Sequence, residues 1–130
     1  METIKRAALI LWQLPQTILG LLVLLFTRHK TYIDNGVWVA RHWTSNACFG
    51  EIIILRPYYD SDDHGHECGH REQSRMAGLL YLLLVGIPSA AGNLIDRWCH
   101  KSWTKREKRM WYYNLPWEAD ADERGGVWRW

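Results

Sequence analysis

Two long stretches without a charged side chain, Ala7–Phe26 and Met76–Ile95, constrain the fold of this 130-residue chain more than any other feature. Each holds twenty residues, which as one straight α-helix would reach about 30 Å, the thickness of a bilayer core. A chain of this size forms one domain and could hardly cover helices that are apolar on every side. We therefore expect the protein to associate with a membrane.

The first stretch is predicted to be an N-terminal hydrophobic anchor helix. Its first half is interrupted by Gln13, Pro15 and Gln16, so that a kinked span and a re-entrant hairpin both fit. A cleaved signal peptide is disfavoured, because no small-residue cleavage site follows Phe26. We predict a membrane anchor over residues 1–30 and a single metal-binding domain over residues 31–130.

The segment between the two stretches carries the β signals. Asp34-Asn35-Gly36 followed by Val37-Trp38-Val39 predicts a short hairpin. The β-branched run Ile52-Ile53-Ile54-Leu55 has the length of a strand. The fold class is therefore α+β, mostly helical with a short β element.

The most specific motif is His66-Glu67-Cys68-Gly69-His70, an H-E-x-x-H pattern. It lies on a helix expected from about His64 to Arg75, with Asp62 or Asp63 as its N-cap. Residues four apart share one helix face, so His66 and His70 can bind one metal ion, unless both are merely solvated. Glu67 is rotated to where a carboxylate can contact a metal-bound water. Two histidines on zinc with a glutamate as general base is the metalloprotease arrangement.

A third ligand is predicted near the C-terminus. Pro116 favours the first turn of a helix and Gly125-Gly126 favours its end. Between them, Glu118 and Asp122 lie four apart, on one face. Glu118 can supply the third zinc ligand, and Asp122 can accept the other ring N–H of a ligating histidine. The alternative is an acidic helix that is only exposed to solvent.

The two motifs together, H-E-x-x-H followed by E-x-x-x-D, resemble the signature of gluzincins, the thermolysin-like zinc peptidases. The segment Glu118–Asp122, with Gly125 three residues further on, is similar to that of membrane-bound gluzincins that include the prenyl-protein proteases. Asp120 stands where that family usually has Glu. The resemblance implies a Zn²⁺ cofactor and an endopeptidase acting on a peptide or protein substrate.

In peptidases of the H-E-x-x-H class, an edge strand just before the metal helix receives the substrate backbone by strand addition. The residues in that position here are Gly50, Glu51, Ile52, Ile53 and Ile54. A strand that only packs against the metal helix fits the same sequence.

The proposed ligands also restrict the topology, because one zinc ion cannot be bound from both sides of a bilayer. Met76–Ile95 must then be re-entrant, interfacial or packed in the core, and its break at Gly86 and Pro88 favours a re-entrant or interfacial helix. The next segment, Asp96–Arg109, is basic and carries tryptophans, which suits anionic lipid headgroups on the cytoplasmic side. We expect the inner, cytoplasmic membrane of a bacterium, with the active site on its cytoplasmic side. The net charge of +2 gives no support for nucleic-acid binding.

Two questions stay open at the level of sequence. The residue that stabilises the oxyanion is one of four unranked candidates: His64, His100, Tyr112 and Tyr113. The second question is function itself, since a non-catalytic, membrane-anchored metal-binding or interaction module fits the same motifs, as a homo-oligomer or on a larger membrane partner. A fourth protein ligand such as Cys48, Cys68 or His64 would indicate this closed structural site, whereas a water in that position would indicate an enzyme.

Overall fold

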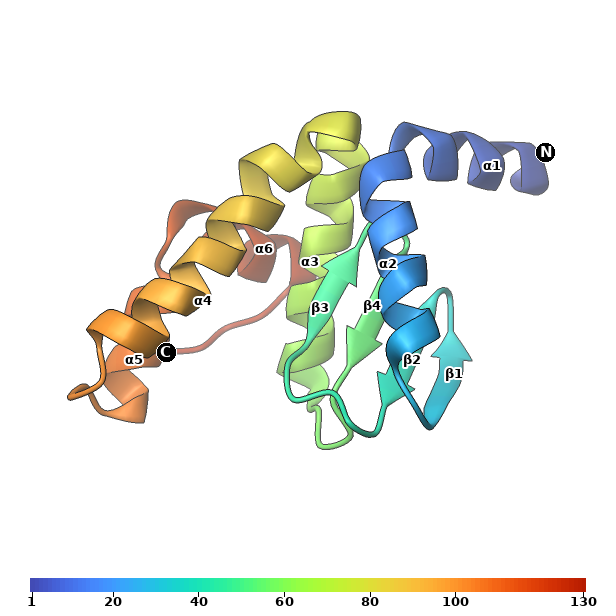
Figure 1. Ribbon diagram of the computed structural model, residues 1–130. Coiled ribbons are helices and arrows are strands. Elements are labelled where there is room, and N and C mark those ends of the chain that lie inside the picture. Colours follow the sequence, from blue (N-terminus) through green and yellow to red (C-terminus); the bar gives the residue numbers. More distant parts are fainter.

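A small β-sheet lies between two helices in the computed structural model, which describes residues 1–130 (Figure 1). The predicted α+β class is confirmed. The elements follow in the order α1 (Glu2–Trp12), α2 (Leu14–Phe26), β1 (Lys30–Asp34), β2 (Val37–Ala40), β3 (Ala47–Phe49), β4 (Ile52–Leu55), α3 (Ser61–Ala77), η1 (Gly78–Leu80), η2 (Leu82–Gly86), α4 (Ile87–Cys99), α5 (Lys105–Tyr113) and α6 (Pro116–Gly125).

The sheet is built from two hairpins in the strand order β1-β2-β4-β3. The predicted first hairpin is confirmed: β1 pairs antiparallel with β2, and Asn35 and Gly36 turn the chain with φ values of 45° and 78°. Strand β2 then pairs parallel with β4. Along β4, Ile53 packs in a cluster with Cys68 of α3, while Ile54 packs in a second cluster with Leu24 of α2. This alternation covers one face of the sheet with α3 and the other with α2.

The prediction of an edge strand over residues 50–54 is wrong. Strand β4 lies between β2 and β3, and Gly50 and Glu51 form the turn that precedes it. The most apolar strand takes the centre because its side chains are buried on both faces, with Ile53, Ile54 and Leu55 each 0% exposed. The edge is instead the shorter strand β3, which pairs antiparallel with β4.

The first apolar stretch is bent by 92° between α1 and α2. The two glutamines at the bend, Gln13 and Gln16, are fully buried. Ser74 of α3 donates to Gln13 Oε1 (2.5 Å) and accepts from Gln16 Nε2 (2.8 Å). Contacts therefore cross the predicted boundary at residue 30 and tie the N-terminal helices to α3.

The second apolar stretch also bends, by 120° between the helix ending at Leu80 and the helix starting at Leu82. The predicted break at Gly86 and Pro88 is wrong. The chain turns at Gly78, which has a φ of 57° and packs directly against the ring of Trp12, whereas Pro88 lies in the first turn of α4, where proline is tolerated. After this bend, α4 runs back down beside α3 and diverges from it toward α5 (Figure 1).

The length and apolar character of the helices can be compared with the predicted membrane segments. No single helix is long and apolar enough to cross a bilayer, although each of the two bent helix pairs passes by length and composition when taken together.

Candidate metal centre

The H-E-x-x-H motif lies on the buried face of α3. Its histidines and glutamate are only 5–6% exposed, so the alternative of solvated histidines is wrong. The N-cap is Asp60 rather than the predicted Asp62 or Asp63. Asp60 accepts from the backbone N–H of Asp63 (2.8 Å), and the Asp63 carboxylate accepts from the N–H of Asp60 (3.2 Å), a reciprocal capping box that starts the helix earlier than expected.

Helix α6 runs between Pro116 and Gly125 as predicted, and Gly126 ends it in the left-handed conformation. It packs on α3 with backbone against backbone. A Cβ added to Gly69 would lie 1.8 Å from the carbonyl oxygen of Ala121, and one added to Gly125 would lie 1.9 Å from that of Gly65. This seam of small residues, Gly65 and Gly69 against Ala121 and Gly125, fixes the separation of the two helices.

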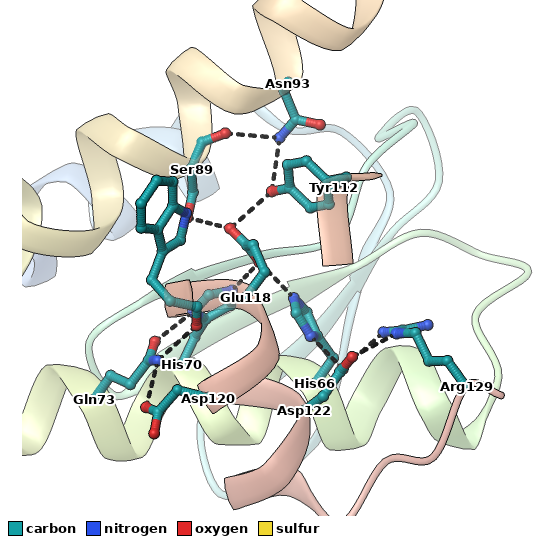
Figure 2. A network of polar contacts seen from close by, with 11 residues as sticks. His66, His70, Gln73, Ser89, Asn93, Tyr112, Glu118, Asp120, Asp122 and Arg129 are labelled. Carbon is teal, nitrogen blue, oxygen red and sulfur yellow. Dashed lines mark hydrogen bonds and ion pairs between the residues drawn. The ribbon is translucent and has the colours of Figure 1, made fainter. Parts of the chain in front are cut away.

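Because the two helices are so close, Glu118 of α6 lies next to His66 and His70 of α3. The three predicted ligands are therefore neighbours (Figure 2). Glu118 Oε2 lies 3.1 Å from His66 Nε2 and 3.1 Å from His70 Nε2. Metal–ligand bonds of about 2.0–2.2 Å in a tetrahedron place ligand atoms about 3.3 Å apart. All three side chains are buried, and the group could hold one metal ion.

The outer ring nitrogens of both histidines also face oxygen acceptors. His66 Nδ1 lies 2.7 Å from Asp122 Oδ1, which is the predicted contact, and His70 Nδ1 lies 2.7 Å from Gln73 Oε1. A neutral imidazole can donate from only one of its nitrogens. With Nδ1–H donated outward, each Nε2 presents a lone pair toward Glu118, where a cation would satisfy all three atoms.

The orientation of Gln73 is fixed by its own contacts. Its amide nitrogen donates to the carbonyl oxygen of Trp117 and to Asp120 Oδ2, both at 2.8 Å, so its oxygen must be the atom that faces His70. Asp120 is the position where the sequence departs from the gluzincin pattern. Gln73 lies three residues after His70 on the same helix, a spacing at which two side chains are neighbours and which the sequence therefore displays.

The second oxygen of Glu118 is held from the opposite side. Ser89 Oγ and the Tyr112 hydroxyl (3.0 Å) both donate to Oε1, and Asn93 Nδ2 in turn donates to the Tyr112 oxygen (3.1 Å). Helices α4 and α5 thereby direct the other oxygen, Oε2, toward the histidines. Nothing in the local sequence around Ser89 indicates this role.

Burial and mutual hydrogen bonds shift the pKa values of all three groups. Burial raises the pKa of Glu118, but hydrogen bonds with His66 and His70 outweigh burial and hold the pKa well below its usual range. Burial lowers the pKa of His66, but hydrogen bonds to Asp122 and Glu118 raise it to about 9. A proton on His66 would therefore compete with a metal ion for this site, and metal binding would displace it.

A cleft of about 610 Å³ opens beside the ligand group. Glu67 lines it together with His66 and His70, and its Oε2 atom is buried with no hydrogen-bond partner. Burial raises the pKa of Glu67, an effect that His70 and His66 partly offset. The walls of the cleft come from β3 on one side and from η2 and α4 on the other.

Two of the four candidate oxyanion stabilisers reach this cleft, Tyr112 and Tyr113. His100 does not, because it stacks on Trp103 at 3.6 Å and bonds to Asp96 at 3.0 Å. His64 is also outside the cleft lining and faces the ring of Tyr59.

No fourth histidine, cysteine or carboxylate joins the ligand group. The Cys48 thiol donates to the carbonyl oxygen of Gly50, and Cys68 packs against the core cluster under the sheet, so neither is directed at the ligand group. All three cysteines are free. Comparisons of the chain with protein-family models, curated proteins and solved structures find no match.

Proposed function

We propose that this protein is a membrane-associated, zinc-dependent endopeptidase in which His66, His70 and Glu118 bind the zinc ion. The observation that carries the proposal is the position of Glu67. Its carboxylate faces the same cleft as the ligand group and has an oxygen without a partner. An open coordination position beside a free carboxylate suits hydrolysis, whereas a structural zinc site has four protein ligands.

The residues of the chain divide the chemistry between them. Zinc, when bound, lowers the pKa of a coordinated water toward about 7 and polarises the substrate carbonyl. Glu67 accepts the proton of the attacking water and delivers it to the leaving amine. Asp122 and Gln73 keep the histidine rings in the ligating tautomer. The one hydroxyl proton of Tyr112 is already donated to Glu118, so we assign oxyanion stabilisation to Tyr113, the other tyrosine that lines the cleft.

The substrate is an extended polypeptide that adds to the free edge of β3. That strand lines the cleft with its whole length, Ala47–Phe49, and its outer edge has no partner strand. Main-chain hydrogen bonds give such added strands their affinity, and alternate side chains enter pockets. The lining of the cleft includes the apolar side chains of Leu19, Leu82 and Ile87, which favour an apolar substrate side chain.

Metal dependence is the experiment that tests this function. Protein stripped of metal should not cleave an unstructured polypeptide such as reduced casein, and one equivalent of zinc should restore cleavage because the open site then holds its cofactor. Magnesium serves as the control and should restore nothing, since it prefers octahedral oxygen ligands. Cleavage that persists unchanged in the metal-free protein would refute the proposal.

We propose that the exposed apolar surface of the protein binds a lipid bilayer. Helix α2 exposes a row of large apolar residues that includes Leu21 (52%), Leu25 (73%) and Phe26 (84%). The region of the second bend exposes Leu79, Leu80, Leu83 and Leu84, each by more than half. Contiguous apolar surface of this kind marks a membrane or protein interface, and the basic, tryptophan-containing segment after α4 favours anionic lipid headgroups.

We expect the purified protein to float with vesicles that contain anionic phospholipid. The double substitution Leu25→Asp and Phe26→Asp should reduce the bound fraction at least tenfold, because each apolar side chain contributes about 1.5–3 kcal/mol when it leaves water. Tyr58→Asp is the control, since Tyr58 is 67% exposed in the loop after β4. Vesicle binding by the double variant at the level of the unmodified protein would exclude α2 as the contact surface.

A further inference from the structure

Arg129 is a buried arginine that contacts both groups packed around His66. Its Nε and Nη2 atoms donate to Asp122 Oδ2 (2.7 Å) and Oδ1 (2.9 Å), and its side chain is only 4% exposed (Figure 2). Its guanidinium carbon also lies 3.5 Å above the ring of Tyr113. That ring meets His66 edge-on, with centroids 5.2 Å apart.

We propose that Arg129 is a positioning residue for the metal ligand His66, acting through Asp122 and Tyr113. The inference deepens the proposed function and rests on it. Asp122 Oδ1 accepts from both His66 and Arg129, so the arginine fixes the plane of the carboxylate that sets the imidazole tautomer. A planar guanidinium with two parallel bonds constrains a carboxylate in a way that a single ammonium contact cannot.

The arrangement on the other histidine supports this role. The acceptor of His70, Gln73, is itself held by two bonds from its amide nitrogen, to Trp117 and to Asp120. The acceptor of His66, Asp122, is likewise held by two bonds, and both come from Arg129. The Nδ1 atom of each ligating histidine thus faces an acceptor side chain whose orientation is fixed by two further hydrogen bonds.

A purely structural role for Arg129 would be to fasten the segment that follows α6. That segment is already fastened by other contacts, because the side chain of Val127 is buried and its N–H donates to the carbonyl oxygen of Asp122 (2.8 Å). The guanidinium bonds are therefore additional to the docking of the segment and are directed at the carboxylate next to His66.

The test measures metal binding in the full chain, with Arg129→Met and Arg129→Lys beside the unmodified protein. Zinc affinity by competition with a chromophoric chelator should fall about 10–100-fold in Arg129→Met, the usual cost of losing an outer partner of a ligand. The visible spectrum of the cobalt-substituted variant should also change, because the His66 ring is no longer held in one orientation. Arg129→Lys should lie between the two. Arg106→Met, on the exposed surface of α5, removes one positive charge as a control and should match the unmodified protein.

The outcomes separate the inference from the proposed function. If the unmodified protein binds neither zinc nor cobalt, the proposed metal site itself fails. If it binds both, and Arg129→Met has the same affinity and the same cobalt spectrum, the positioning role is overturned while the metal site stands. Should Arg129→Met not fold, Arg129→Lys decides, since an affinity and spectrum identical to those of the unmodified protein would overturn the role.

Discussion

Glu67→Gln is expected to abolish peptide cleavage and to leave zinc binding unchanged. Glutamine keeps the size of the side chain but cannot accept the proton of the attacking water, and general base catalysis contributes about 10²–10⁴-fold. Zinc binding should persist because Glu67 is not among the three ligand residues. The measurements are kcat/KM on a fluorogenic peptide and the zinc content of the purified variant.

Glu72→Gln is the matched control for this substitution. Glu72 lies on the same helix, but its side chain is 54% exposed and only approaches Arg124 at 3.9 Å. The control should cleave at the rate of the unmodified protein. Should Glu67→Gln also cleave within about twofold of that rate, Glu67 is not the general base.

Gly69→Ala should disrupt the metal site although the substituted residue is not a ligand. The new methyl group would lie 1.8 Å from the carbonyl oxygen of Ala121, so α6 has to move away by roughly 1.5 Å to restore ordinary contact. Glu118 moves with α6 and leaves the position 3.1 Å from both histidines. We expect zinc affinity to fall more than about 100-fold and stability to fall by about 3 kcal/mol. Chelator competition and urea unfolding measure the two effects.

Gly86→Ala provides the control for adding a methyl group to a helical glycine. The nearest atom to its new Cβ would be the tip of the flexible Leu82 side chain, at 3.0 Å, and the other neighbours lie at ordinary contact distances of 3.8 and 3.9 Å. Zinc affinity should therefore stay within about threefold of the unmodified value. If Gly69→Ala behaves in the same way, the close approach of α3 and α6 does not determine the site.

The parts of the site that the sequence predicts are those set by local geometry. His66 and His70 share a face because the helix repeats every 3.6 residues, and α6 begins and ends at its proline and glycine signals. The Asn35-Gly36 turn likewise determines its hairpin through backbone conformation alone. The meeting of Glu118 with the two histidines is predicted instead from the resemblance of the two motifs to the gluzincin signature.

The parts that the sequence does not predict depend on contacts between distant residues. The bend at Gly78 is set by the ring of Trp12, far away in the chain, while Pro88 fits a helical first turn. The centre of the sheet goes to β4 because α2 and α3 bury both of its faces. The role of the small residues on α3 and α6 cannot be predicted from either helix alone, because it depends on the contact between the two helices.

The most direct test of the metal centre is X-ray absorption at the zinc edge of the zinc-loaded protein. We predict one zinc ion per chain with nitrogen and oxygen neighbours at about 2.0–2.2 Å, two of them showing the multiple scattering of imidazole. Glu118 and a solvent oxygen complete the four positions. Sulfur neighbours at about 2.3 Å, which would place Cys48 or Cys68 on the metal, or a chain that retains no zinc, would contradict it.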